Sequence, residues 1–183
     1  VWPDGTFVPG AVERCPDTTG PFAIGTFDHT ALADSPGSTN LCLTPPANDE
    51  CLDAFVAVDG SNAVSNGSAT ESPEPWDFDD GSGGCAGGPN GGLSSDVWYS
   101  YTAVADGTIV VDTCDLINFD SNVGVYSGDC SALVTLGGSC DTTGCGGFTG
   151  TTAPIAVNAG ETFLIRIGTW QGAPGGEGTF NIN

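Results

Sequence analysis

Eight cysteines in a chain of 183 residues constrain the fold more than any other feature of this sequence. They are Cys15, Cys42, Cys51, Cys85, Cys114, Cys130, Cys140 and Cys145. An even number of cysteines in a small, loop-rich chain is typical of an extracellular disulfide framework. A zinc site is disfavoured, because the chain has one histidine and no CxxC pair. Eight cysteines allow about a hundred pairings, so their number does not give the connectivity.

Frequent turn residues divide the rest of the chain into short apolar runs. The chain contains twenty-nine glycines and twelve prolines. Short apolar runs separated by such turn-forming residues are typical of an all-β protein. Strands are expected near residues 54–58, 96–104, 108–113, 122–126, 133–137, 154–158, 162–168 and 179–182. This spacing predicts a β-sandwich. The gap at residues 65–95 is expected to be a long loop.

The run at residues 96–114 carries the clearest strand pattern. Apolar and aromatic residues flank Asp106-Gly107 and predict an antiparallel hairpin. Alternation places Val97, Tyr99 and Tyr101 on one face of its first strand, which we expect to be a core face.

A second clear strand pattern occupies residues 162–168. Phe163, Ile165 and Ile167 share one face, and Arg166 lies opposite. We expect Arg166 either to point outward or to pair with a carboxylate.

Several short motifs resemble those of a known family. They are Asn48-Asp49-Glu50-Cys51, Asp96-Val97-Trp98-Tyr99-Ser100-Tyr101, Gly107-Thr108, Asp112-Thr113-Cys114, Phe119-Asp120, Val125-Tyr126-Ser127-Gly128 and Gly160-Glu161-Thr162-Phe163-Leu164-Ile165-Arg166-Ile167-Gly168. Together they resemble the bacterial pre-peptidase C-terminal (PPC) domain over residues 46–183. The resemblance implies a secreted, antiparallel β-sandwich of jelly-roll type, usually appended to enzymes or surface proteins and not itself catalytic.

The resemblance also bears on the disulfides. It implies a pair between Cys51 and Cys85, which leaves Cys15 and Cys42 to pair with each other before the sandwich. Cys114 ends one expected strand, and a later strand that returns to the same end is followed by Cys140 and Cys145. Either of these two is a candidate partner for Cys114.

The net charge of the chain disfavours some classes of binding partner. Two basic residues stand against twenty-three acidic ones, giving a net charge of -21. Such a surface repels phosphate backbones and anionic lipids, so nucleic acid and acidic membranes are disfavoured. No apolar run approaches the length of about 20 residues that spans a bilayer. The absence of methionine and the start at Val1 favour a mature exported protein, secreted or at the cell surface.

Residues 1–45 form an extended leading segment that the resemblance leaves unexplained. Their extended candidates lie at residues 6–8 and 21–27. Ordering such a polar segment costs about 1–2 kcal/mol per residue, so it requires a docking surface. One alternative is its own sandwich. The other is the sheet edge of a neighbouring copy, reached through Phe22, Ile24 and Phe27; such head-to-tail contacts do not close and therefore form filaments.

Two acidic clusters are candidate calcium sites. The first contains Asp77, Asp79 and Asp80. The second contains Asp112, Asp115 and Asp120 with Asn122, and Asp141 would join it if the fold brings that residue near. Calcium prefers six to eight oxygen ligands, which alternate carboxylates and carbonyls can supply. The alternative is a solvated acidic loop in each case.

Catalytic residues are not predicted. His29 is the single histidine, lysine is absent, and the Gly-x-Ser-x-Gly pattern does not occur. Paired carboxylates could hydrolyse glycosides, but proximity of two acids is uninformative in a chain this acidic. We therefore expect a protein that is not an enzyme.

Trp76 and Trp170 are candidate binding residues, because both lie in turn-rich contexts. Each could stack on a sugar ring or cover the end of the sandwich core. Asn66-Gly67-Ser68 is an N-glycosylation sequon within the expected long loop.

The sequence as a whole favours a non-catalytic extracellular structural or adhesive protein. In its most specific form it is a filament subunit assembled by strand addition through residues 1–45. The alternative is a polysaccharide-binding or accessory module of a secreted hydrolase.

Overall fold

The computed structural model describes residues 44–74, 76, 78, 85 and 92–183, and the backbone of two short strands before them. The chain divides into two compact units, Val1–Thr44 and Pro45–Asn183. In the first unit, β1 (Val12–Arg14) pairs antiparallel with β2 (Phe22–Ile24). Strand β2 falls inside the extended candidate at residues 21–27, whereas β1 was not expected. The candidate at residues 6–8 lies outside the described residues.

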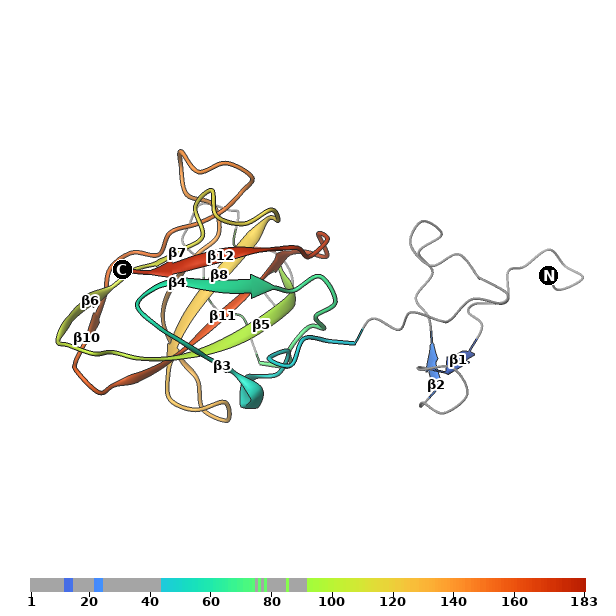
Figure 1. Cartoon of the computed structure of the whole chain (residues 1–183), viewed down its shortest axis with the longest axis horizontal. Coiled ribbons are helices and arrows are strands. Elements are labelled where there is room, and N and C mark those ends of the chain that lie inside the picture. The colour runs from blue at the N-terminus through green and yellow to red at the C-terminus, as the bar shows by residue number, and fades with distance from the viewer. Residues whose placement is uncertain are drawn as a thin grey trace, which may run out of the picture. The chain divides into compact units, whose positions relative to one another are not determined.

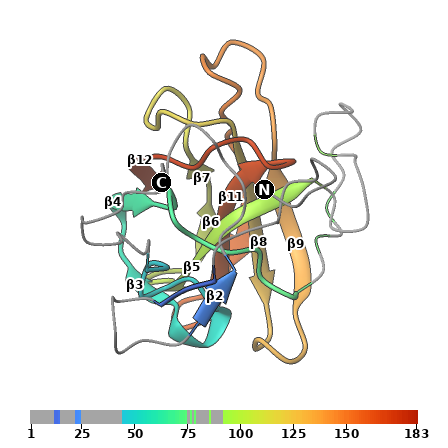
Figure 2. The same cartoon turned by 90° about the vertical axis from the view of Figure 1, so that its right-hand side faces the viewer.

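The second unit contains two main sheets (Figures 1 and 2). The first has the order β3-β5-β11-β8-β9 and is built from β3 (Phe55–Ala57), β5 (Leu93–Thr102), β11 (Thr162–Trp170), β8 (Ser121–Ser127) and β9 (Val134–Ser139). The second has the order β4-β12-β7 and is built from β4 (Gly60–Ser65), β12 (Glu177–Ile182) and β7 (Val111–Asp112). A separate ladder joins β6 (Gly107–Ile109) to β10 (Ile155–Val157), and a 3-10 turn, η1 (Cys51–Asp53), precedes β3.

This arrangement confirms the all-β sandwich. Strand pairing is antiparallel apart from β3, which runs parallel to β5. Strand β4 was not expected, because its sequence Gly-Ser-Asn-Ala-Val-Ser contains a single large apolar residue and lacks an alternating pattern.

The hairpin expected over residues 96–114 is wrong. Strand β5 pairs with β3 and β11, whereas β6 pairs with β10. The connection between β5 and β6 is bonded to the segment before β11 instead of closing on itself: Ala103 N donates to Glu161 O at 2.9 Å, and Ala159 N donates to Asp106 Oδ1 at 2.8 Å. The Asp-Gly pair therefore lies at a corner where the chain leaves one sheet for another ladder.

The core lies between the two main sheets. It contains Val97, Tyr99 and Tyr101 from β5, as the alternation predicts. The other sheet contributes residues such as Phe180, whose ring centroid lies 4.7 Å from that of Tyr99 in an edge-to-face arrangement. The predicted core face of β11, with Phe163, Ile165 and Ile167, packs in the same cluster.

The outer face of the five-stranded sheet is buried as well. Trp98 and Arg166 are both fully buried there. Arg166 forms a two-pronged ion pair with Asp96, in which Nε donates to Oδ2 at 2.8 Å and Nη2 donates to Oδ1 at 3.1 Å. Its carbon Cζ lies 5.1 Å from the ring centroid of Trp98. The expected carboxylate partner of Arg166 is thus confirmed, and the alternative of an outward side chain is wrong.

The segment at residues 70–74 covers this buried ion pair. Ser72 Oγ donates to Asp96 Oδ2 at 2.5 Å and accepts from Trp98 Nε1 at 2.8 Å. The guanidinium also donates to the carbonyl of Glu74 at 2.7 Å and to that of Ser72 at 3.1 Å. Part of the expected long loop therefore forms a third layer over the sheet.

The disulfides differ from the pairing that the family resemblance implies. The structure joins Cys51 to Cys130, Cys85 to Cys140 and Cys114 to Cys145, so the Cys51–Cys85 pair is wrong. Cys51 packs on the outer face of the sheet with Cys130, which follows β8. The expectation that Cys114 pairs with Cys140 or Cys145 is confirmed. Cys15 and Cys42 lie outside the described residues, within which every cysteine is paired.

Replacing Arg166 with Met should destabilise the sandwich by about 3–5 kcal/mol, because Asp96 is left as an unpaired buried charge. Urea unfolding followed by tryptophan fluorescence measures this loss. Adding Asp96→Asn to Arg166→Met should restore part of it, since the remaining group is then neutral. The exposed Asp53→Asn serves as the control. A loss below about 1 kcal/mol for Arg166→Met would contradict the role of the ion pair.

Candidate functional site

Exposed apolar side chains gather at the beginning of the sandwich, in and beside β3. The exposed fractions are 87% for Leu52, 49% for Phe55, 81% for Val56 and 58% for Val58. These four residues are called the β3 patch. Within the described part of the chain, β3 is an edge strand of its sheet. Natural proteins usually protect such an edge with charged residues, so an apolar edge indicates an interaction surface.

A groove of about 710 Å³ opens beside the β3 patch. One wall is formed by Phe55 of β3 and Tyr99 of β5, and the other by residues such as Ala63 of β4 and Thr179 of β12. The groove therefore lies between the two main sheets, where their outer strands β3 and β4 leave the sandwich open. Tyr99 Oη donates to the carbonyl of Ala63 at 2.8 Å and ties the two walls together.

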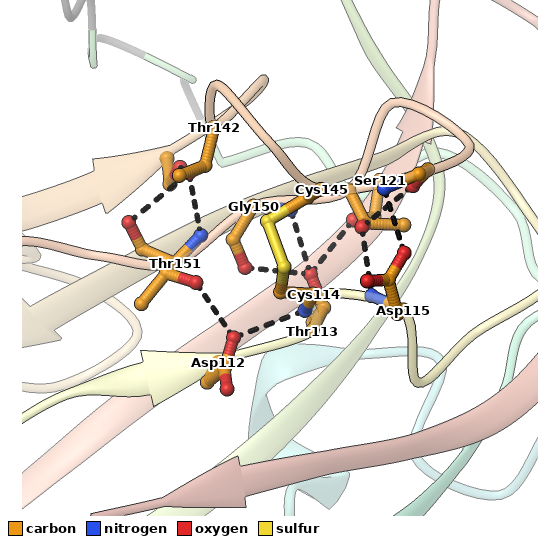
Figure 3. Close-up of a disulfide and its surroundings, with 12 residues drawn as sticks. Asp112, Thr113, Cys114, Asp115, Ser121, Thr142, Cys145, Gly150 and Thr151 are labelled. Carbon is orange, nitrogen blue, oxygen red and sulfur yellow. Dashed lines mark hydrogen bonds between the residues drawn. A yellow bond between two sulfur atoms is a disulfide. The ribbon is translucent and has the colours of Figure 1, made fainter.

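A second candidate surface is formed by two loops that the Cys114–Cys145 disulfide joins (Figure 3). We call residues 113–120 and 140–152 the stapled loops. Thr113 Oγ1 donates to Gly150 O at 2.9 Å and accepts from Gly150 N at 3.1 Å. The Thr113 hydroxyl also lies 3.0 Å from the hydroxyl of Ser121. The loops are thus connected by hydrogen bonds as well as by the disulfide.

The structure gives two of the predicted calcium ligands other partners in these loops. Asp112 Oδ1 accepts from Cys114 N at 3.0 Å and from Thr151 Oγ1 at 2.6 Å. Asp115 Oδ1 accepts from Gly146 N at 2.6 Å. Both carboxylates hold the loops together (Figure 3), and the structure does not bring them into one site with Asp120.

Calcium binding stays a prediction. Asp77, Asp79 and Asp80 lie outside the described residues. Within residues 44–74, 76, 78, 85 and 92–183, the structure shows no group of three or more His, Cys, Asp or Glu side chains that could hold a metal ion.

The two candidate tryptophans have different environments. Trp76 is 4% exposed and packs edge-on against Phe78, with centroids 6.0 Å apart. A Cβ atom on Gly124 would come within 2.8 Å of the Trp76 ring, and one on Gly138 within 2.8 Å of Phe78. Gly124 and Gly138 face each other across β8 and β9, so this glycine pair makes room for the two rings. Trp76 is therefore not an open stacking platform. It is buried on the outer face of the five-stranded sheet, beside the Gly124–Arg166 pair, and does not cover the end of the core between the sheets.

Trp170 ends β11 and is 39% exposed. The tight turn that follows it is held by Ala173 N, which donates to Trp170 O at 2.7 Å. Stacking of the Trp170 ring on a sugar therefore stays a prediction.

Asn66 has a structural role in the fold. Its side chain is fully buried. Its Nδ2 donates to Ser95 O at 2.7 Å, and its Oδ1 accepts from Gly176 N at 2.8 Å. The amide nitrogen that a glycan would need is therefore inaccessible in the folded chain, and the expected glycosylation does not fit the structure.

The remaining predicted residues lie in the first unit. Phe22 and Ile24 belong to β2, of which the structure describes the backbone. Phe27 and His29 lie outside the described residues.

Sequence reasoning missed the β3 patch and Phe148. The patch lies in Cys-Leu-Asp-Ala-Phe-Val-Ala-Val at residues 51–58, an apolar run without alternation. Such a run is usually interpreted as a strand buried on both faces. Phe148 is 66% exposed in a glycine-rich run. A large aromatic residue among glycines was the available signal.

Comparison with protein-family models, curated proteins and solved structures finds no match to this chain. The resemblance to the PPC domain stays a prediction. Within the described part of the chain, none of the helical segments has the length and apolar character needed to cross a bilayer.

Replacing Asp120 with Asn should stabilise the protein at pH 7 and have little effect at pH 3. Burial and the negative charge of Asp141 raise the pKa of the Asp120 carboxyl. The raised pKa means that protonation favours the folded state, an advantage lost as the pH rises through that pKa. The gain at pH 7 should be below about 1 kcal/mol, because solvent screens the pair. Urea midpoints at both pH values measure it.

Asp129→Asn is the control for this experiment and should have the opposite sign. Hydrogen bonds from Ser131 lower the pKa of the Asp129 carboxyl. Its contribution to stability is present at neutral pH and lost as the pH falls. If both variants shift stability in the same direction at pH 7, the electrostatic account of Asp120 is wrong.

Proposed function

We propose that this chain is a non-catalytic extracellular structural protein whose copies assemble head to tail. In this arrangement, residues 1–44 of one copy add a strand to the β3 patch of the next. The observation that carries the proposal is the β3 patch itself, an apolar strand edge beside an open groove, flanked by the exposed Asp53 and Asp59. Strand addition uses backbone hydrogen bonds for affinity and side-chain pockets for specificity.

The leading segment has the properties that such a donor needs. In its described part it contains one two-stranded ladder, formed by β1 and β2. A two-stranded ladder alone is only marginally stable in water. Pairing of β2 with a further strand edge would make a larger sheet. In this proposal the strand edge that receives β2 belongs to a second copy of this chain.

The charge of the leading segment also suits a donor that docks on an acidic sandwich. Its first 44 residues carry five acidic side chains and Arg14, whereas the remainder carries eighteen acidic side chains and Arg166. The net charge is thus -4 over the first 44 residues and -17 over the following 139, so a negatively charged sandwich repels the leading segment less, per residue, than it repels another sandwich. Three disulfides in the described residues suit a protein that stays folded outside the cell.

Val56→Lys should raise the protein concentration needed for assembly at least about tenfold, because it places a charge in the centre of the receiving edge. Sedimentation velocity and negative-stain electron microscopy of the full chain measure assembly. Val134→Lys is the matched control, since Val134 is 58% exposed on β9 at the opposite edge of the same sheet. Equal effects of the two substitutions would show that β3 is not the specific receiver.

A synthetic peptide of residues 16–31, which contains no cysteine, should cap growth and shorten the filaments of the full chain. It carries Phe22, Ile24 and Phe27 and would compete for the β3 patch. A peptide with these three residues replaced by Ser is the control. Unchanged filament lengths with the first peptide would contradict strand addition by this segment.

A further inference from the structure

One peptide group connects two exposed aromatic residues at the end of the sandwich where β8 begins. This is the group between Asp120 and Ser121. Its N–H, on Ser121, donates to Phe148 O at 3.1 Å, and its carbonyl, on Asp120, accepts from Trp170 N at 3.3 Å. The backbones of Phe148 and Trp170, which are distant in sequence, are therefore held on opposite sides of a single peptide unit.

Both aromatic residues remain open to solvent. Phe148 is 66% exposed and Trp170 is 39% exposed, whereas Trp98 is fully buried. Exposed large aromatic residues on neighbouring backbone segments are a feature of binding surfaces.

The backbone at this surface is strained and firmly held. Phe148 has a φ of 57°, and Gln171, next to Trp170, has a φ of 35°. The left-handed region is unfavourable for a bulky residue such as Phe. Such strain persists where the surroundings impose it, and it gathers at functional sites. Here the neighbouring Thr149 accepts from Asp115 N at 3.1 Å and donates to Gly146 O at 2.9 Å.

Two carboxyl groups complete the surface. Asp120 belongs to the bridging peptide. Asp141 adjoins Thr142, whose N donates at 3.1 Å to the carbonyl of Thr149, next to Phe148, and the charge of Asp141 raises the pKa of the Asp120 carboxyl. These groups accept hydrogen bonds from hydroxyl groups and repel anions. The net charge of -21 adds to this repulsion. The surface therefore suits a ligand with apolar ring faces, many hydroxyl groups and no negative charge.

We propose that Phe148, Trp170, Asp120 and Asp141 form a binding site for a neutral polysaccharide. The two rings stack on the apolar faces of sugar units, and the carboxylates accept hydrogen bonds from sugar hydroxyls. Because hydrogen bonds already hold the backbone of both residues, binding loses little backbone entropy. This function is separate from assembly through the β3 patch, and each can hold without the other.

Affinity gel electrophoresis of the full chain tests the site. The probes are soluble β-glucan, galactomannan, arabinoxylan and dextran, with polygalacturonate as the anionic comparison. At least one neutral polymer should retard the protein, and polygalacturonate should not. Absence of retardation by all four neutral polymers overturns the proposal, and so does retardation by polygalacturonate alone.

The decisive variant is Phe148→Gly. Glycine adopts a positive φ without strain, so this variant should keep or raise the melting temperature. It should nevertheless weaken binding at least tenfold, as should Trp170→Ala. A residue with a merely structural role would not lower affinity while leaving stability intact.

Phe55→Ala is the matched control, because Phe55 is an exposed aromatic residue of the β3 patch. It should leave polysaccharide binding unchanged. Binding that survives both Phe148→Gly and Trp170→Ala, or that Phe55→Ala weakens to the same degree, overturns the assignment of the site.

Discussion

The buried ion pair between Arg166 and Asp96 is the interaction on which the layered structure depends. Both side chains are fully buried, on the outer face of the five-stranded sheet. An arginine there requires hydrogen-bond partners for its five N–H donors. Asp96 accepts two of the hydrogen bonds, and the carbonyls of Ser72 and Glu74 accept one each. The segment that supplies them must therefore stay against the sheet. One charged residue in β11 thus converts part of a long loop into a third layer.

The third layer determines where the protein can interact with other molecules. Strands β5, β11 and β8 are buried on both faces, by the core on one side and by the covering segment and its disulfides on the other. Their faces are closed to partners. Exposed apolar residues are consequently found at strand edges, as in the β3 patch, and in the stapled loops, as at Phe148.

The sequence pattern correctly predicted which residues of a strand share a face. Phe163, Ile165 and Ile167 alternate in sequence and share a core face in the structure, because side-chain direction in a strand has a period of two. Strand partners are set over long distances, so Asp106-Gly107 suggested a hairpin that does not form. The Cys51–Cys130 pair likewise depends on how the outer face is covered. The backbone position of Phe148 depends on a hydrogen bond from Ser121, a residue distant in sequence, which no local pattern contains.

The distribution of charge limits how copies of this chain can meet. Its basic residues are Arg14 and Arg166. Arg166 is buried in an ion pair with Asp96 and cannot reach another molecule. Contacts between two sandwiches therefore have almost no ion pairs available and must overcome like-charge repulsion. Backbone hydrogen bonds and apolar contacts do not require a charge of opposite sign on the partner. Salt weakens the long-range repulsion between the two acidic sandwiches. An apolar strand edge is thus the kind of contact that such an acidic protein can use, and association should become stronger as ionic strength rises.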